Sequence, residues 1–395
     1  MSQLEEIGNE MENRKLNLIE ILKEVNVSGF LDNWGPMRIL QVYDPEVNMQ
    51  GILVIDNTVL GAGCGFIKIS PVITCREVFH NARVMTWACA LANVNFGGAS
   101  AGIKANPSEI NKNLFIRAFA KGISAYVPDQ FIAVPGYDVG RAEMAAFTDE
   151  VGDSRGAINI DLSSLGLGIG ITIGAAIDSG LSSFSLPEKL SDVKIVIQGF
   201  NQTGCAAAKY LANKGAKIIA ISDDWCTISD PKGIELEVVY KHCCAETERK
   251  SLKQCKGFKK HSKEEIVKFD CDVFIAGSGN GVFNEEIANS LKAKCIVESA
   301  YRPMPGVVDQ TLHNRGVLVI PDILTAACEA IIAYGNQNGN RPERALSLME
   351  TRMNEITKQT VTQAIEQDIP LRRICRDVAQ ERILKAMEVK NGHSL

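Results

Sequence analysis

Four residues in the second half of the chain have the types and spacing of a dinucleotide-binding turn. Gly199, Asn201 and Gly204 follow the apolar run KIVIQ, and Asp223 ends the next apolar run, KIIAIS. A G-x-G-x-x-G turn binds pyrophosphate because small residues let backbone N–H groups at a helix N-terminus approach the anion. An acid after the second strand accepts hydrogen bonds from the adenosine ribose, which favours NAD over NADP. The sequence therefore predicts an NAD site; the alternative is a scaffold that binds no nucleotide.

The middle position of this turn departs from the pattern. Asn201 stands where a glycine would allow the closest approach to the phosphates. Asparagine tolerates left-handed backbone angles, so the turn can still form. We expect the Asn201 side chain either to point away from the ligand or to hydrogen-bond it.

The segments around the turn alternate between strand and helix. The run VKIVIQ precedes the turn and the helical run CAAAKYLANKG follows it, with later strands at KIIAISDD, DVFIAG, KCIVES and VLVIP. Parallel strands need helical crossovers, so this order predicts a parallel, doubly wound sheet of the Rossmann type. We expect this domain to occupy residues 186–340.

Another α/β unit precedes it. The β-type runs ILVI, FIKIS, AGIKA and QFIAV alternate with helical stretches such as REVFHNARVMTWACALANV. A chain of 395 residues exceeds the ~250 to 300 at which single cores stop growing. We therefore expect an α/β fold of two domains, with an N-terminal domain over residues 1–185. Helix spacing over residues 341–395 predicts C-terminal helices that pack back on the first domain.

Composition excludes several partner classes. The formal net charge of −5 offers no basic surface for nucleic acid, and the most apolar segment, Leu165–Ile177, is too short to cross a membrane. The first 25 residues mix acids and bases, which predicts an amphipathic helix and not a secretory signal. Twelve cysteines scattered singly are typical of reduced thiols. We expect a cytoplasmic protein that binds a small molecule and neither nucleic acid nor membrane.

One group of histidines and cysteines has the residue types of a zinc site. Its members are His242, Cys243, Cys244, Cys255 and His261. The group lacks paired C-x-x-C knuckles, and adjacent cysteines rarely chelate one ion well. We expect a Lys-rich segment at the protein surface here and no bound metal.

Seven segments together resemble the glutamate/leucine/phenylalanine/valine dehydrogenases, most closely the short archaeal glutamate dehydrogenases. They are VIDNTVLGAGCGFIK, MTWACALANVNFGGASAGIKANP, VPGYDVGRAEMAAF, VIQGFNQTG, IVESAYRPM, IPDIL and LRRICRDVAQERILKAM. The resemblance covers nearly the whole chain. It implies hydride transfer from an amino acid to nicotinamide, a first domain for substrate and oligomerisation, and a homo-oligomer, usually a hexamer.

The resemblance fails at the family's lysines. The catalytic lysine of GG(A/G)K corresponds to Ser100, and the substrate-binding lysine of MTWK corresponds to Ala88. A third lysine, which leucine-type members also lack, corresponds to Cys64. Removing one preorganised charge costs ~3 to 4 kcal/mol, so we expect no ordinary deamination of glutamate or leucine. Lys68 and Lys104 could keep positive charge nearby, or they could be surface lysines.

Asp138, in PGYDVGR, matches the family aspartate that shuttles protons during imine hydrolysis. Without a neighbouring lysine this carboxylate is a weak base. The alternative role is an N-cap for the helix VGRAEMAAF.

The other walls of the cleft differ from the family as well. The family's T-G-x-G becomes Leu165–Gly168, and its N-A-G-G becomes Ala326–Glu329. In the family's E-G-A-N motif a cofactor contact becomes Tyr301, and a substrate-contacting serine becomes Ala333. These changes indicate that the catalytic function of the cleft has changed or has been lost.

Three functions remain open. The retained Asp138 and the nucleotide-type β-α-β order favour first a divergent NAD-linked oxidoreductase that acts on a small, less anionic substrate. The chain could instead be a non-catalytic paralogue that joins or regulates an active relative in a mixed oligomer. The third alternative is a sensor in which a ligand closes the cleft without reaction.

Overall fold

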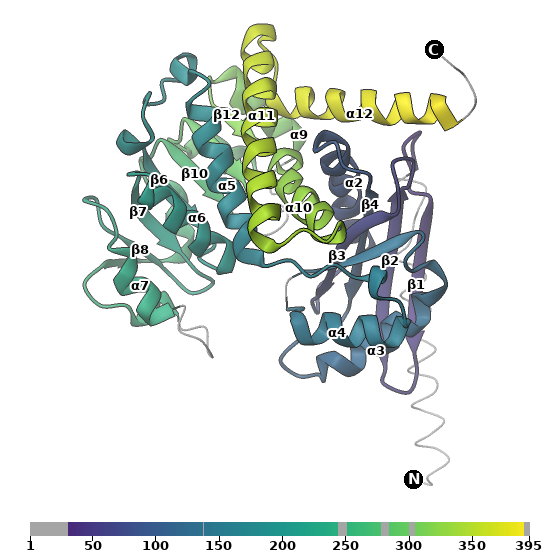
Figure 1. The fold of residues 1–395 in the computed structure, drawn as a ribbon. Coiled ribbons are helices and arrows are strands. Elements are labelled where there is room, and N and C mark those ends of the chain that lie inside the picture. The colour runs from purple at the N-terminus through teal and green to yellow at the C-terminus, as the bar shows by residue number, and fades with distance from the viewer. Residues whose placement is uncertain (1–30, 137, 244–250, 278–283, 300–304, 391–395) are drawn as a thin grey trace.

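Two α/β lobes lie side by side, and long C-terminal helices run across them (Figure 1). The computed structural model describes residues 31–136, 138–243, 251–277, 284–299 and 305–390. The helix expected over the first 25 residues lies outside these ranges. The two-domain α/β architecture predicted from the sequence is confirmed.

The first lobe contains a five-stranded mixed sheet in the order β1-β2-β4-β3-β5. Strands β1 and β2 and strands β2 and β4 pair antiparallel, whereas β3 runs parallel to β4 and β5. Helix α2 packs on one face, and α3 and α4 contribute to a separate core on the other. The bounds are β1 Arg38–Asp44, β2 Met49–Asn57, β3 Gly63–Ile69, α2 Cys75–Leu91, β4 Gly97–Ile103, α3 Lys112–Ile123, β5 Phe131–Pro135 and α4 Arg141–Val151.

Small residues in β4 let α2 lie close to the sheet. A Cβ on Gly98 would come within 2.2 Å of the backbone nitrogen of Thr86, and one on Gly102 within 2.6 Å of Ile73. Side chains alternate across a strand, so Ser100, between these glycines, also faces α2. Ala99 and Ala101 face the opposite core.

The second lobe contains a seven-stranded sheet in the order β12-β11-β10-β6-β7-β8-β9. The first five strands of this order run parallel and the last two pair antiparallel. This is the doubly wound sheet expected from the alternating sequence pattern. The bounds are α5 Leu162–Ile177, β6 Lys194–Gln198, α6 Gln202–Asn213, β7 Lys217–Ser222, β8 Thr227–Ser229, α7 Leu236–Cys243, β9 Lys259–His261, β10 Val273–Ala276, α8 Glu285–Ser290, β11 Cys295–Glu298, α9 Gly306–Asn314 and β12 Leu318–Ile320.

Three C-terminal helices connect the lobes. They are α10 Asp322–Gln337, α11 Pro342–Gln367 and α12 Leu371–Lys390. Helix α11 packs against α10 and α5, and α12 packs against α2, so the expected return to the first domain is confirmed. Short 3₁₀ turns cover Ser124–Tyr126, Ser154–Gly156, Leu181–Phe184, Leu190–Asp192, Leu252–Gln254 and Lys263–Lys268.

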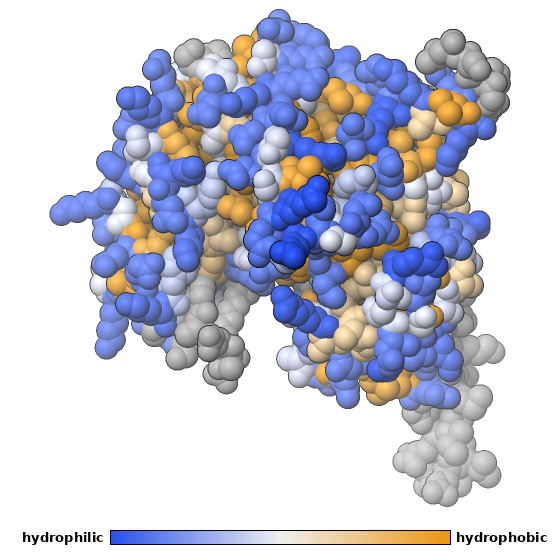
Figure 2. Space-filling model, in the orientation of Figure 1, coloured by the Kyte–Doolittle hydropathy of each residue, from blue (hydrophilic) through white to orange (hydrophobic). Residues whose placement is uncertain are grey.

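One apolar core is continuous across both lobes. It joins Met85 and Ala88 on α2 to Ala333 on α10, Ile374 on α12 and Ile197 on β6. The visible outer face is mainly hydrophilic, with apolar residues scattered between charged ones (Figure 2). Within the described residues, no helix is both long and apolar enough to span a membrane.

Candidate functional site

The turn between β6 and α6 has the backbone geometry that a dinucleotide site requires. Gly199 has a φ of +93°, and a Cβ there would lie 3.1 Å from the backbone of Gly277. A Cβ on Gly204 would lie 2.2 Å from the Gly199 carbonyl oxygen. Both glycines are therefore needed for this turn.

Asn201 caps the helix that follows the turn. Its Oδ1 accepts a hydrogen bond from the Gly204 N–H at 3.0 Å, and its backbone is extended, with a φ of −95°. A left-handed conformation is therefore not needed here. The cap engages one of the N–H groups that an anion at this helix end would use.

A buried acceptor without a partner lies next to the turn. Gln198 ends β6 and pairs with Ala276 on β10, which in turn pairs with Glu298 on β11. The Gln198 Oε1 atom is buried and accepts no hydrogen bond from the residues that the structure describes. Leaving a buried acceptor unsatisfied costs ~1 to 3 kcal/mol. Open α/β sheets bind ligands where the strand order reverses, and a ligand donor there would relieve this cost.

The acid predicted to bind ribose is engaged by its own loop. Asp223 Oδ1 accepts hydrogen bonds from the N–H groups of Trp225 and Cys226, both at 2.8 Å. Its Oδ2 accepts a third from the Leu252 N–H at 2.7 Å, and the residue is 8% exposed. A carboxylate offers about four acceptor positions, so most of this group's capacity is already used.

Two exposed lysines act on Cys226, whose N–H donates to the same carboxylate. Lys253 directly follows Leu252, and the Lys260 ammonium donates to the Lys253 carbonyl at 2.6 Å. Burial raises the pKa of the nearby Cys226 thiol to about 11, although both lysines act to lower it. The lysines of this segment are exposed, as expected of a Lys-rich surface segment, and its contact with Asp223 through Leu252 was not predicted.

The residues at the predicted substrate positions are all buried. Cys64 and Ala88 are 0% exposed, and Ser100 and Ala333 are 1% exposed. They come from β3, α2, β4 and α10. The Ser100 hydroxyl donates a long hydrogen bond of 3.5 Å to the Phe66 carbonyl. Small side chains packed in an apolar core replace the charged groups expected of an active family member.

The thiols and charges of this region do not replace the missing lysines. Burial, with a smaller effect from Glu329, raises the pKa of Cys64 to about 12. Burial also raises the pKa of Cys89 well above its usual range. Both thiols are therefore neutral and weakly nucleophilic near neutral pH. The guanidinium of Arg382 acts on Cys89, but it donates to the Cys89 and Ala90 carbonyls at 3.2 and 3.1 Å.

Neither lysine named from the sequence reaches these positions as a free cation. The Lys68 ammonium lies 2.6 Å from a Glu77 carboxylate oxygen, and this pair holds it against α2. Lys104 follows β4 and is exposed at the surface.

Asp138 lies on an exposed loop after β5. It has a φ of +64°, and its carbonyl accepts a hydrogen bond from the Lys112 ammonium at 3.0 Å. The helix-cap alternative is wrong, because Gly140 is the N-cap of α4 and its N–H donates to Glu143 at 2.8 Å. A capping residue must directly precede the helix, and Asp138 is two positions too early.

The remaining wall residues have structural contacts. Gly166, near the start of α5, lies so close to α6 that a Cβ would come within 2.1 Å of the Thr203 carbonyl oxygen. Cys328 on α10 lies against Gly168, where a Cβ would be 2.6 Å away. Tyr301 lies outside the described residues.

A buried charge cluster, formed by one arginine and three carboxylates, was not predicted from the sequence. The Arg372 guanidinium on α12 lies 2.7 Å from Glu298, 2.9 Å from Asp322 and 3.2 Å from Asp309. Burial raises the pKa of Glu298 to about 8, and the negative charge of Asp322 adds to this, although Arg372 acts to lower it. The acids come from β11, α10 and α9, so separation in sequence hides the cluster.

The histidine and cysteine group does not converge in the described structure. Cys255 is buried, and the His261 ring hydrogen-bonds the Ser229 hydroxyl at 2.9 Å. Cys244 and the side chains of His242 and Cys243 lie outside the described residues. Among the residues that are described, no three His, Cys, Asp or Glu side chains form a group that could hold a metal ion.

A mixed-sheet domain beside a doubly wound sheet with a glycine turn defines a two-domain α/β protein of the nucleotide-binding type. Residues 36–153 match the family model of the Glu/Leu/Phe/Val dehydrogenase dimerisation domain, and residues 159–391 match that of Glutamate/Leucine/Phenylalanine/Valine dehydrogenase. The chain therefore belongs to the Glu/Leu/Phe/Val dehydrogenase family, as its motifs predicted.

Sequence relatives and solved structures agree with this assignment. Over 363 residues, 85% of each chain, the protein is 30% identical to a glutamate dehydrogenase of Aeropyrum pernix. It is 29% identical over 367 residues to an NADP-specific glutamate dehydrogenase of Saccharolobus shibatae, covering 85% of this chain and 83% of the other.

The fold is similar to that of a hetero-hexameric glutamate dehydrogenase from Thermus thermophilus, with a TM-score of 0.76, 20% identity and 96% coverage of both chains. It is also similar to an L-tryptophan dehydrogenase from Nostoc punctiforme, with a TM-score of 0.63, 21% identity and coverage of 89% and 96%.

Proposed function

We propose that this chain is a non-catalytic member of its family that serves as a structural or regulatory subunit of an oligomer. The main support is the closed interior at the positions of the family's two active-site lysines, Ser100 and Ala88. A buried ammonium there could polarise a carbonyl, whereas a hydroxyl and a methyl group cannot supply that charge.

Family membership supports an oligomeric assembly. The first domain matches a dimerisation domain, and one structural neighbour is described as a hetero-hexamer. Losing catalytic residues inside the cleft does not change the outer subunit surfaces. We propose an oligomer, with a hexamer as the first expectation, made of identical copies or of copies mixed with an active relative.

A turnover and co-assembly experiment tests this function. The purified chain is incubated with glutamate or leucine and with NAD or NADP, and ammonia release is measured. We expect none above background. Co-expression with an active dehydrogenase of the same organism is expected to give a mixed oligomer of altered activity. Brisk ammonia release by the pure chain would contradict the proposal.

The second candidate is an NAD(P)-linked oxidoreductase for a small, less anionic substrate. The glycine turn and the unsatisfied Gln198 Oε1 favour it, because both fit a nucleotide in the crevice. Gly199, Gly204 and Gln198 would hold the cofactor, whose nicotinamide would accept a hydride. A calorimetric titration that showed no heat with NAD(H) or NADP(H) would exclude this candidate.

The residues expected to lie near the adenosine ribose bear on the choice between NAD and NADP. Asp223 is largely occupied by backbone N–H groups, and Lys253 and Lys260 lie nearby. Ammonium groups favour a 2′-phosphate, so this corner supports NADP more than the NAD expected from Asp223 alone. Tighter binding of adenosine 5′-monophosphate than of its 2′-phosphorylated form would restore NAD as the better candidate.

We infer a cytoplasmic location. The ten cysteines whose side chains are described form no disulfide bond, and nine of them are buried. This is typical of proteins that fold in a reducing compartment. Fractionation of cells that express the native chain would test it.

A further inference from the structure

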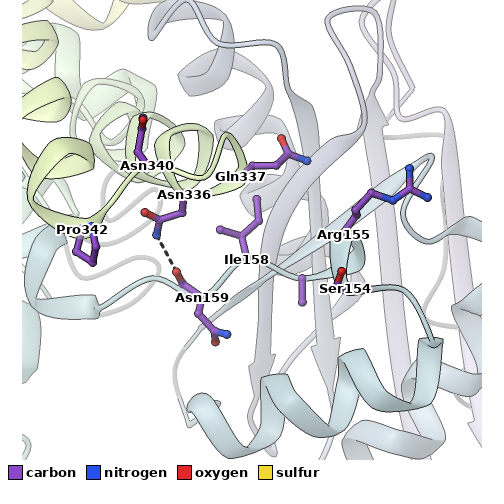
Figure 3. A pocket seen from close by; sticks show the side chains of 9 residues that line it. Ser154, Arg155, Ile158, Asn159, Asn336, Gln337, Asn340 and Pro342 are labelled. Atoms are coloured by element: carbon purple, nitrogen blue, oxygen red, sulfur yellow. Dashed lines mark hydrogen bonds between the residues drawn. The ribbon is translucent and has the colours of Figure 1, made fainter.

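A cavity of about 450 Å³ lies where the two matched domains meet. Two segments far apart in sequence line it, 154–159 and 336–342 (Figure 3). The first segment links the family's two matched regions, and the second is the turn from α10 to α11. The cavity is remote in sequence from the dinucleotide turn and from the lysine positions.

Hydrogen bonds fix both walls. The Asn336 Nδ2 donates to the Asn159 carbonyl at 2.8 Å and so ties the two segments together (Figure 3). The Ile158 N–H donates to the Ala133 carbonyl at 2.8 Å, and the Asn340 N–H donates to the Gly335 carbonyl at 3.1 Å. The cavity is therefore formed before any ligand binds, which reduces the ordering cost of binding.

The lining is rich in carboxamides. Asn159, Gln337 and Asn340 make no side-chain hydrogen bond to any other described residue. The Asn336 amide gives one N–H to the wall and keeps its oxygen as an acceptor. Each group offers donors and acceptors in one plane. Ile158 adds a buried apolar surface.

Arg155 is the one charged residue among those that line the cavity. Its guanidinium is held by its neighbour Asp153, with the closest oxygen at 2.6 Å. A cation would find no carboxylate among the lining residues, and an anion would compete with Asp153 for Arg155. An apolar ligand would remove water from the carboxamides without replacing their hydrogen bonds.

We propose that this cavity binds a small neutral molecule that carries a carboxamide group. A carboxamide can pair with an Asn or Gln side chain through two hydrogen bonds at once, as these side chains do with adenine edges. A hydroxyl makes one such contact at a time and brings an additional rotor. This site adds ligand regulation to the subunit role proposed above. A ligand there contacts the first domain and the α10–α11 turn together, and so regulates the position of the two lobes relative to each other.

Calorimetric titration of the full chain tests the site with L-glutamine as the probe. L-Glutamate is the isosteric charged control, and glucose is the hydroxyl control. We expect saturable binding of glutamine, with glutamate and glucose about tenfold weaker or more, since a lost hydrogen-bonded pair is worth about this factor.

Two variants locate the binding. Gln337→Met and Asn340→Leu keep the side-chain size, remove the carboxamide, and are expected to weaken glutamine binding at least about tenfold. Gln359→Met, on the exposed face of α11 outside the cavity, should bind as the unmodified chain does. Circular dichroism confirms that each variant is folded.

Three outcomes would overturn the proposal: no saturable binding of glutamine, equal or tighter binding of glucose, or unchanged binding by both cavity variants. The experiment needs neither turnover nor nucleotide. Its result is therefore independent of whether the subunit is catalytic.

Discussion

At the scale of single residues, the identities of Ser100 and Ala88 matter less than their burial. A lysine at either position would place an ammonium in an interior that is 1% or 0% exposed. Moving an unpaired charge into such a medium costs several kcal/mol, or it depresses the pKa of the amine until it is neutral. Because both positions now hold small neutral groups in a buried environment, we expect that restoring one lysine would not restore catalysis.

Substitution Ser100→Lys is therefore expected to lower the free energy of unfolding by roughly 3 to 5 kcal/mol and to give no glutamate turnover. Urea unfolding and an ammonia assay measure the two effects. The matched control Ser100→Ala loses only the long bond to Phe66, so we expect a change of about 1 kcal/mol or less. A Ser100→Lys protein of normal stability that deaminates glutamate would show an open, functional cleft.

At the scale of secondary-structure elements, glycines set the distances between helices and sheets. Gly98 on β4 faces the backbone of α2 with no room for a Cβ. Gly174 on α5 has no heavy atom within 4 Å of the position its Cβ would take. The same substitution should therefore have opposite effects at the two positions.

Gly98→Ala is expected to destabilise the protein by about 1 to 3 kcal/mol, because α2 must move away from β4. Gly174→Ala should stabilise it by about 0.5 to 1 kcal/mol, since alanine is the better helix former. Chemical denaturation of both variants measures the difference. Equal effects of the two substitutions would contradict the predicted contact between α2 and β4.

The sequence predicts these elements well and the site less well. Strands β6 and β7 and helix α6 follow from apolar periodicity and glycine spacing, which are local properties. The engagement of Asp223 depends on Leu252, whose N–H comes from a distant loop, so no local pattern reveals it. The burial of Ser100 likewise depends on how α2 packs against β4. The positive φ of Asp138 and the start of α4 at Arg141 could not be read from spacing.

At the scale of the whole molecule, Arg372 connects the last helix to three separate elements of the second lobe. Three carboxylates around one guanidinium leave negative charge uncompensated, and burial makes that charge costly. The pKa of Glu298 is therefore raised, so the folded protein holds a proton that the unfolded chain releases above its ordinary carboxyl pKa near 4.5.

Stability is expected to depend on pH with a definite sign. The Glu298 contribution is fully present below pH 4.5, the ordinary pKa of this carboxyl, and is lost as pH rises through about 8. The free energy of unfolding, measured by urea titrations between pH 5 and 9 in steps of about one unit, should therefore include a component that decreases as pH rises. Glu298→Gln cannot release this proton and should remove that component. A dependence that is the same in both proteins would rule out Glu298 as its source.

The apolar core that runs from α2 to β6 also affects how the protein can be divided. If the gene were split between the lobes, each fragment would present to water the surface it now shares with the other, at about 25 cal/mol per Å² of apolar area. Separately expressed fragments would aggregate, whereas co-produced fragments could complement each other. A fusion tag or fluorescent reporter is therefore best placed at a chain end and not between the lobes.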